Sequence, residues 1–159
     1  MKKSISFNVV FRIRKELTSK AALFNQIYDT RNYRKVFNVA PFVHFKCSED
    51  FFEKGSLISV HFLFPFLSYK MKVVKVITNE LIEFEGNYAP VHGTVKFIIT
   101  EDDKSLIYQE PHIILPINRF YYCCYLLMRP CHNWYMKRQY KVLHKILTSN
   151  SMDDNPETS

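Results

Sequence analysis

Glycine is scarce in this sequence, whereas the residues that build a folded core are abundant. Only 3 of the 159 residues are glycine, while 47% are hydrophobic and 16% are aromatic. This composition excludes a disordered or low-complexity chain, because such chains bury too little apolar surface to offset the entropy of folding. The length suits one domain, so we expect a single domain over residues 1–148 and a disordered acidic tail over residues 149–159.

A long apolar run is also absent. The longest uninterrupted one, residues 120–128, is far shorter than the roughly 20 residues that a membrane-spanning helix requires. At the N-terminus, two lysines are followed by serine, asparagine and arginine residues that interrupt any apolar signal region. We therefore expect a cytoplasmic protein whose cysteines are reduced thiols.

The four cysteines lack the spacing of a metal site. Zinc is bound by pairs such as Cys-x-x-Cys, whose side chains turn toward one ion, but Cys123 and Cys124 are adjacent and diverge. No second cysteine pair and no His-x-x-x-His pair completes a ligand set. We predict no metal site and no cofactor, and we interpret the cysteines as small buried hydrophobic residues.

Acidic residues are sparse outside the C-terminal end. The chain has 22 basic and 15 acidic residues, a net charge of +7, and three of the acids lie in the last ten residues. Residues 1–149 therefore hold 12 acids and carry +10. A basic body attracts polyanions, but the basic residues occur as pairs without a nucleic-acid-binding motif, which argues against nucleic acid as the partner. Peripheral contact with an anionic membrane stays open, through Lys137, Lys141 and Lys145.

Alternation of apolar and polar residues predicts strands over most of the chain. Residues 5–13 alternate cleanly, and two short helices follow, which end near Asp29 and Phe37. Six further alternating segments lie within residues 42–115 and are joined by short turns. This succession predicts an antiparallel sheet with one apolar face.

Helical periodicity returns after Pro130. Residues 132–147 place basic side chains on one side and a mostly apolar stripe, which includes His132 and Met136, on the other. Because this stripe needs an apolar partner, we place it on the apolar face of the sheet. Trp134 is expected to point outward, and residues 117–130 are interpreted as an apolar connection.

This order of elements resembles that of the START-like or Bet v 1-like (SRPBCC) superfamily over about residues 4–148. The similar segments are ISFNVVFRIRK, AALFNQIYDTRNYRKVFNVAPFVHFK, FEKGSLISVHF and HNWYMKRQYKVLHKIL. The resemblance implies an α+β helix-grip fold, in which a curved seven-stranded antiparallel sheet wraps a long C-terminal helix, with two short helices after strand one. Its members mostly bind sterols, other lipids, quinones or polyketides in a cavity, and some catalyse cyclisation there.

The apolar face of the sheet and the last helix supply the predicted ligand-binding residues. A single helix cannot fill a seven-stranded bowl, so we expect a cavity of roughly 300 to 1,000 Å³. Its predicted lining is Phe62, Phe64, Tyr69, Met71, Phe97, Tyr108, His132, Met136, Gln139 and Leu143.

No catalytic residue is assigned, and Glu110 and His112 are the candidates. Pro111 favours a bulge that turns Glu110 out to water, because proline cannot donate to a sheet ladder. In the alternative, Glu110 faces the interior as a proton donor or acceptor.

The leading hypothesis is binding or transfer of a hydrophobic small molecule, such as a lipid, quinone, sterol-like compound or polyketide, without catalysis. The first alternative is an enzyme of the polyketide cyclase, aromatase or dehydratase kind that uses the same cavity. The second alternative is a protein-interaction module that binds a partner protein through residues 120–128.

Overall fold

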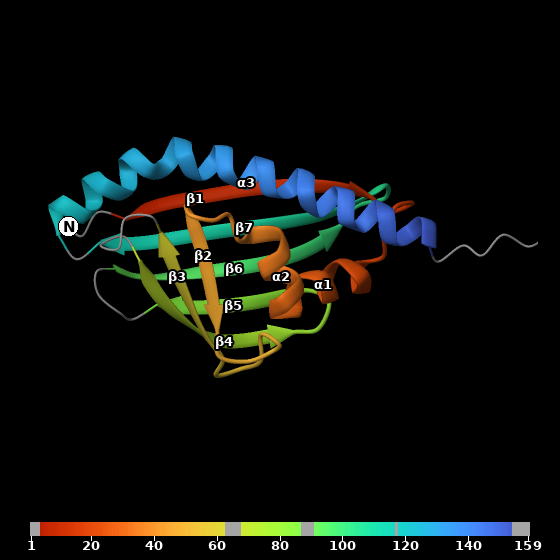
Figure 1. The fold of residues 1–159 in the computed structure, drawn as a ribbon, viewed down its shortest axis with the longest axis horizontal. Helices are drawn as coiled ribbons and strands as arrows, with labels where there is room; N and C mark the ends of the chain where they lie inside the picture. The colour runs from red at the N-terminus through yellow and green to blue at the C-terminus, as the bar shows by residue number, and fades with distance from the viewer. Residues whose placement is uncertain (1–3, 63–67, 87–90, 117, 154–159) are drawn as a thin grey trace, which may run out of the picture.

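The computed structural model describes residues 4–62, 68–86, 91–116 and 118–153. Their elements, in chain order, are β1 (Ile5–Arg14), α1 (Lys20–Tyr28), α2 (Thr30–Phe37), β2 (Val43–Cys47), β3 (Leu57–Phe62), β4 (Tyr69–Ile77), β5 (Leu81–Gly86), β6 (Val91–Glu101), β7 (Ser105–Pro116) and α3 (Arg119–Asp153). Figure 1 shows a curved sheet, with α3 lying along β1 and β7 and with α1 and α2 gathered toward one end.

The seven strands form one antiparallel sheet in the order β1-β7-β6-β5-β4-β3-β2. Five of the six neighbouring pairs are consecutive in the chain, and the sixth joins the first strand, β1, to the last, β7. The register between β4 and β5 shifts at Val73/Lys75, where a bulge adds local twist and bend. Gly55 has a φ of 103° in the turn before β3, a conformation that glycine adopts without strain.

The strand faces follow the predicted alternation, and the predicted α+β helix-grip fold is confirmed. The inward side chains of β3 to β6 are buried: Ile58, Val60, Met71, Val73, Ile82, Phe84, Val95, Phe97 and Ile99. They form one core with the inward side chains of α3, which are Met136, Tyr140, Leu143 and Leu147. Burial of this apolar surface is the main favourable contribution to folding.

The two short helices are also confirmed, and local capping explains where each begins. Ser19 accepts a hydrogen bond from the backbone N–H of Ala22, 3.1 Å away, and so caps α1. Asp29 ends α1 and caps α2, because its carboxylate accepts from the backbone N–H of Arg31 at 2.8 Å. Tyr33 and Phe37 of α2 then point into the interior, where both are fully buried.

Helix α3 corrects the prediction that the closing helix begins after Pro130. It starts at Arg119, where the side chain of Asn118 accepts a hydrogen bond from the N–H of Tyr121 at 3.0 Å. The first turns are held down by Tyr125, which is buried against β1 and β7. Pro130 lies on the exposed side, where water can bond to the carbonyl group that the proline ring leaves free.

The far end of α3 also differs from the prediction. The helix continues to Asp153, five residues into the stretch for which a disordered tail was predicted, and residues 154–159 lie outside the described residues. No helix within the described residues is long and apolar enough to cross a membrane.

Candidate functional site

A buried carboxylate lies at the centre of the interior. Glu110 is 1% exposed, and the hydroxyl group of Tyr108 donates a hydrogen bond to one of its carboxylate oxygens. The Nε2 atom of His112 lies 3.4 Å from the other oxygen. These three residues alternate along β7, so their side chains share the inward face of the sheet.

The expectation that Pro111 turns Glu110 toward water is wrong. Strand β7 keeps one register with β1 across this stretch, where Asn8 is opposite Pro111 and Val9 is opposite Glu110. On the other side, pairing with β6 is interrupted at Pro111 and resumes in the same register, from Val95↔His112 to Ile98↔Gln109. Proline therefore removes one ladder hydrogen bond without adding a residue, and Glu110 stays inward.

Helix α3 brings two further polar side chains to this carboxylate. The ring of His132 lies 5.2 Å from that of His112, and the ring of Tyr140 lies 5.7 Å from that of Tyr108. We call Tyr108, Glu110, His112, His132 and Tyr140 the polar cluster.

Two atoms of the polar cluster are buried without a partner. Among the described residues, Nδ1 of His132 and the hydroxyl group of Tyr140 make no hydrogen bond within the protein. Burial and the adjacent His112 lower the pKa of His132 to about 3, so its ring is neutral near pH 7. Burial, and then the charge of Glu110, raises the pKa of Tyr140, so its hydroxyl group keeps its proton. The cluster thus offers unsatisfied hydrogen-bonding atoms in an apolar surrounding.

Aromatic rings pack the opposite part of the interior, beneath α2. We call Tyr33, Phe37, Phe45, Phe52, Phe84 and Phe97 the aromatic cluster. Tyr33 stacks on Phe37 with ring centroids 4.4 Å apart, and Phe84 meets Phe97 at 4.7 Å. Such offset and edge-to-face pairs stabilise a core beyond their burial alone.

A cavity of about 40 Å³ lies between the two clusters. Since one water molecule needs roughly 10 to 15 Å³ of such space, the cavity has room for a few waters. The cavity that the described residues form here is therefore smaller than the predicted cavity of ligand size, because side chains fill most of the bowl. The lining residues are Tyr33, Phe37, Val43, Phe45, Ile58, Val60, Phe62, Tyr69, Met71, Val95, Phe97, Glu110, His112, His132, Tyr135 and Met136.

Most of the predicted ligand-binding residues meet at this cavity. Six of them line it: Phe62, Tyr69, Met71, Phe97, His132 and Met136. Tyr108, Gln139 and Leu143 are buried but lie outside the lining, and Phe64 lies outside the described residues. Both acid–base candidates, Glu110 and His112, belong to the lining. That any of these residues binds a ligand stays a prediction.

Sequence reasoning missed the contribution of the helices. Tyr33 and Phe37 line the cavity from α2, and their spacing of four residues was a signal that they share one helix face. Tyr140 was missed although it lies four residues after Met136 and three before Leu143, on the same inward side of α3. Tyr135 also lines the cavity, and its hydroxyl group donates to the backbone carbonyl of Phe37, which links α3 to α2.

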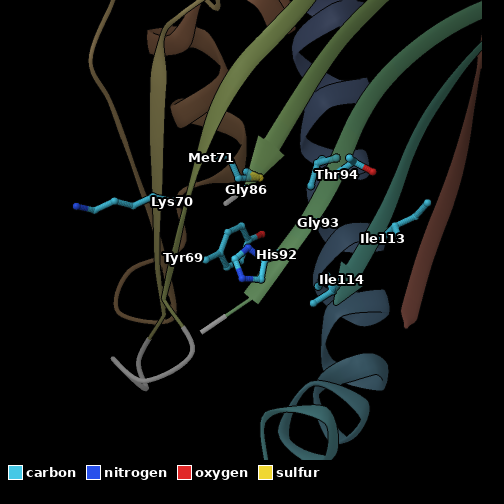
Figure 2. Close-up of a pocket in the computed structure, with 10 residues that line it drawn as sticks. Tyr69, Lys70, Met71, Gly86, His92, Gly93, Thr94, Ile113 and Ile114 are labelled. Atoms are coloured by element: carbon cyan, nitrogen blue, oxygen red, sulfur yellow. The ribbon is translucent and has the colours of Figure 1, made fainter. Parts of the chain in front are cut away.

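A second, smaller hollow of about 20 Å³ lies beside the first, where β5 ends between β4 and β6. Figure 2 shows Tyr69 and His92 projecting into it, while Lys70 and Ile113 point away. Tyr69, Met71 and Val95 line both hollows. Gly93 is required here, because a Cβ atom would lie 2.1 Å from the backbone oxygen of Ile113. Side chains of β4 and β6 therefore contribute to both the central cavity and the hollow at this edge of the sheet.

The four cysteines lie on two elements, Cys47 on β2 and the other three on α3. Within the described residues, no three His, Cys, Asp or Glu side chains are grouped as metal ligands. Cys47 and Cys124 are partly buried, and burial raises the pKa of the Cys47 thiol to about 11. Cys123 and Cys131 are exposed on α3, so the prediction that the cysteines are buried hydrophobic residues is wrong for these two.

Comparison with known proteins identifies the architecture. No family model and no curated protein sequence matches the chain. Among solved structures, norcoclaurine synthase from Thalictrum flavum in complex with dopamine and hydroxybenzaldehyde matches with a TM-score of 0.62 at 12% identity, over 98% of this chain and 90% of that one. The chain has a Bet v 1-like fold. Two further solved structures also match the chain.

The Aha1 dimer from Colwellia psychrerythraea matches with a TM-score of 0.59 at 15% identity, over 91% of this chain and 96% of that one. CalU16 from Micromonospora echinospora matches with a TM-score of 0.58 at 9% identity, over 93% of this chain and 79% of that one. At these identities the likeness establishes the Bet v 1-like fold of the chain and leaves its function to the residues of its own interior.

Proposed function

We propose that this protein binds a compact hydrophobic molecule in the cavity between the polar and aromatic clusters. The observation that carries the proposal is the polar cluster itself. A carboxylate that is 1% exposed, with unpartnered polar atoms of His132 and Tyr140 on the facing helix, is costly to keep in an apolar core. A ligand in the cavity with a polar end would bond to Glu110 and to Nδ1 of His132, whose residues line the cavity, and so offset part of that cost.

The two clusters would have different roles in binding. The aromatic and aliphatic walls would supply affinity, at about 25 cal/mol for each Å² of apolar surface removed from water. The polar cluster would orient the ligand through Glu110 and His132, which line the cavity, since the carboxylate accepts hydrogen bonds and Nδ1 of His132 makes none within the described residues. This arrangement favours a ligand with an apolar ring system and one hydrogen-bond-donating group, such as a hydroxyl or an amine.

The size of the cavity favours a compact ligand over a long-chain lipid. About 40 Å³ does not hold a sterol or an acyl chain, so binding requires side chains of the lining to move. Met71 and Met136 both line the cavity and are suited to this, because the unbranched methionine side chain changes rotamer easily. Small quinones and polyketide-like aromatic compounds belong to the proposed class of compact ligands, whereas larger lipids need a wider cavity.

Acid–base catalysis is a second candidate function, and one contact favours it. Glu110 lies on the cavity wall with Tyr108 and His112 as hydrogen-bonding neighbours, so a proton can pass between these groups and a bound molecule. An enzyme of the cyclase kind would use Glu110 in this way.

Native mass spectrometry of the purified protein, followed by extraction of bound molecules, tests the proposal. The wild-type protein should retain or capture small phenols, aromatic amines or quinones from a panel, with a preference for those that carry a donor group. Glu110→Gln keeps the shape of the side chain but removes its charge, so affinity for donor-bearing ligands should fall by about 10- to 100-fold. Glu53→Gln, at an exposed glutamate, is the matched control and should bind as the wild type does.

The outcomes separate the two functions. If the extracted molecule is chemically changed by the wild-type protein and remains unchanged on Glu110→Gln, the site is catalytic. If no member of the panel binds at any concentration below the millimolar range, and the protein is empty from every host, the binding proposal fails.

A further inference from the structure

The outer side of α3 carries an exposed apolar stripe over its first half. Phe120, Leu127 and Trp134 are 61%, 76% and 65% exposed, and they are spaced seven residues apart, which places them on one side of the helix. The exposed residues Cys123 and Cys131 lie between them on the same side. Figure 1 shows that α3 lies at the margin of the molecule, with one side turned away from the sheet. We call these five residues the apolar stripe.

The same side of α3 becomes basic over its second half. Lys137, Arg138, Lys141 and Lys145 are all exposed, and helical geometry places them in line with the apolar stripe. Residues 119–152 contain no aspartate or glutamate. Within the part of the chain that the structure describes, none of these four basic side chains forms an ion pair. The outer face therefore combines large exposed apolar side chains with uncompensated positive charge.

From this juxtaposition we propose that the outer face of α3 binds the surface of an anionic lipid bilayer. Phe120, Leu127 and Trp134 insert among the lipid head groups and the upper acyl chains, as the apolar face of an interfacial helix does. The basic residues of the second half lie on the bilayer surface and contact the negatively charged head groups. Trp134 lies at the junction of the two halves, at the depth that tryptophan prefers in membranes.

A second copy of the chain is the other occupant that an apolar helix face can have, and the charges argue against it. In a parallel pair of α3 helices, the basic halves would face each other. In an antiparallel pair, each apolar stripe would face the basic half of the other helix, and residues 119–152 offer no carboxylate to pair with it. A bilayer that contains phosphatidylserine supplies both an apolar interior and negative charge.

The other large exposed apolar residues do not form a comparable surface. Outside α3, these residues are Val10 on β1, Phe42 before β2, Phe51 before β3, Leu57 on β3, Ile77 on β4 and Ile113 on β7. These residues come from separate elements and are not followed by a basic segment on one helix face. They therefore provide matched controls for the apolar stripe.

The test uses Trp134 as its probe, because it is the one tryptophan in the sequence. Its fluorescence should shift to shorter wavelength with vesicles of phosphatidylcholine and phosphatidylserine, and should stay unchanged with vesicles of phosphatidylcholine alone. Co-sedimentation with the same vesicles gives the affinity, which should fall as salt concentration rises.

Two sets of variants test the apolar stripe and the basic half of the outer face separately. Leu127→Glu should lower the affinity for anionic vesicles at least tenfold, whereas Phe42→Glu, at another exposed apolar residue, should not change it. Lys141→Glu with Lys145→Glu should lower the affinity by about fivefold or more for each lysine, whereas Lys54→Glu should have little effect. Circular dichroism confirms that each variant is folded.

Three results would overturn the proposal. The first is that folded wild-type protein binds neither kind of vesicle. The second is equal binding to both, unaffected by Lys141→Glu and Lys145→Glu. The third is a dimer in light scattering that Leu127→Glu dissociates, since this would identify a second copy of the chain as the occupant of the face.

Discussion

The two parts of the interior that meet at the cavity are built on different principles. Beneath α2, the aromatic cluster packs ring against ring, with Phe52 and Phe84 at 5.2 Å and Tyr33 and Phe97 at 5.4 Å. Beneath α3, the polar cluster holds a buried carboxylate and leaves two polar atoms without a partner in the described part of the chain. One side is close-packed and apolar, and the other is polar and incompletely satisfied.

This difference indicates a division of labour. Close packing of large apolar side chains is the arrangement that contributes most to the stability of a core. Buried polar groups without full hydrogen bonding lower stability, and natural proteins concentrate such groups at functional sites. We infer that the aromatic cluster stabilises the fold and that the polar cluster is maintained for ligand binding.

The largest expected effect comes from opening the aromatic cluster. Phe84→Ala removes a fully buried ring that contacts Phe52 and Phe97, and should lower the free energy of unfolding by about 3 to 5 kcal/mol. Urea unfolding followed by circular dichroism measures the change. The exposed residue Phe42 provides the control, because Phe42→Ala should change stability by less than about 0.5 kcal/mol. If Phe84→Ala and Phe42→Ala lower the free energy of unfolding equally, the aromatic cluster is not the part of the interior that stabilises the fold.

A smaller, pH-dependent effect should come from His132 in the polar cluster. The folded protein keeps this ring neutral down to a pKa of about 3, whereas the unfolded chain takes up a proton near pH 6.5. Between these two values the unfolded state binds more protons, so stability falls as the pH falls through this window. The contribution is at most about 1.4 kcal/mol for each pH unit, and less because the ring is partly exposed.

His132→Phe isolates this contribution. The difference in unfolding free energy between pH 7 and pH 5 should be smaller for the variant than for the wild-type protein, by about 1 to 2 kcal/mol. Urea unfolding at the two pH values measures it. Equal pH dependence in both proteins would mean that the folded ring titrates near its ordinary pKa, and thus that the polar cluster is open to water.

The same contrast explains what the sequence could and could not predict. The strands, their inward faces and the two short helices follow from alternation and capping, which are local, and residues such as Val60, Phe84 and Phe97 are where the pattern places them. The sequence does not reveal where α3 starts, because Pro130 predicts a boundary, although Asn118, twelve residues earlier, is a residue type that caps helices. Whether a proline ends a helix depends on which side faces solvent, and that is set by tertiary packing.

The polar cluster was only partly predictable for the same reason. The alternation of Tyr108, Glu110 and His112 placed them on one strand face, but the effect of Pro111 depended on the register with both β1 and β6. The pairing of His132 with His112, and of Tyr140 with Tyr108, joins residues far apart in the chain. The periodicity of a segment predicts which face each side chain occupies. Which side chains from different segments meet is determined only by the packed structure.

The smallest expected change tests the claim that the polar cluster is incompletely satisfied. Tyr140→Phe removes a buried hydroxyl group that has no partner within the described residues, so stability should stay within about 0.5 kcal/mol of the wild type or rise by up to about 1 kcal/mol. The stacking of this ring on Phe11, at 4.7 Å, is retained by phenylalanine.

Tyr108→Phe is the matched comparison, because it also removes one buried hydroxyl group, but one that donates to Glu110. Tyr108→Phe should lower the free energy of unfolding by about 1 to 3 kcal/mol, since the carboxylate loses a hydrogen-bond donor. A similar cost for Tyr140→Phe would show that its hydroxyl group already has a partner, such as bound water, in the ligand-free protein. The hydroxyl group of Tyr140 would then be satisfied without a ligand, and Nδ1 of His132 would remain as the unpartnered buried atom of the polar cluster within the described residues.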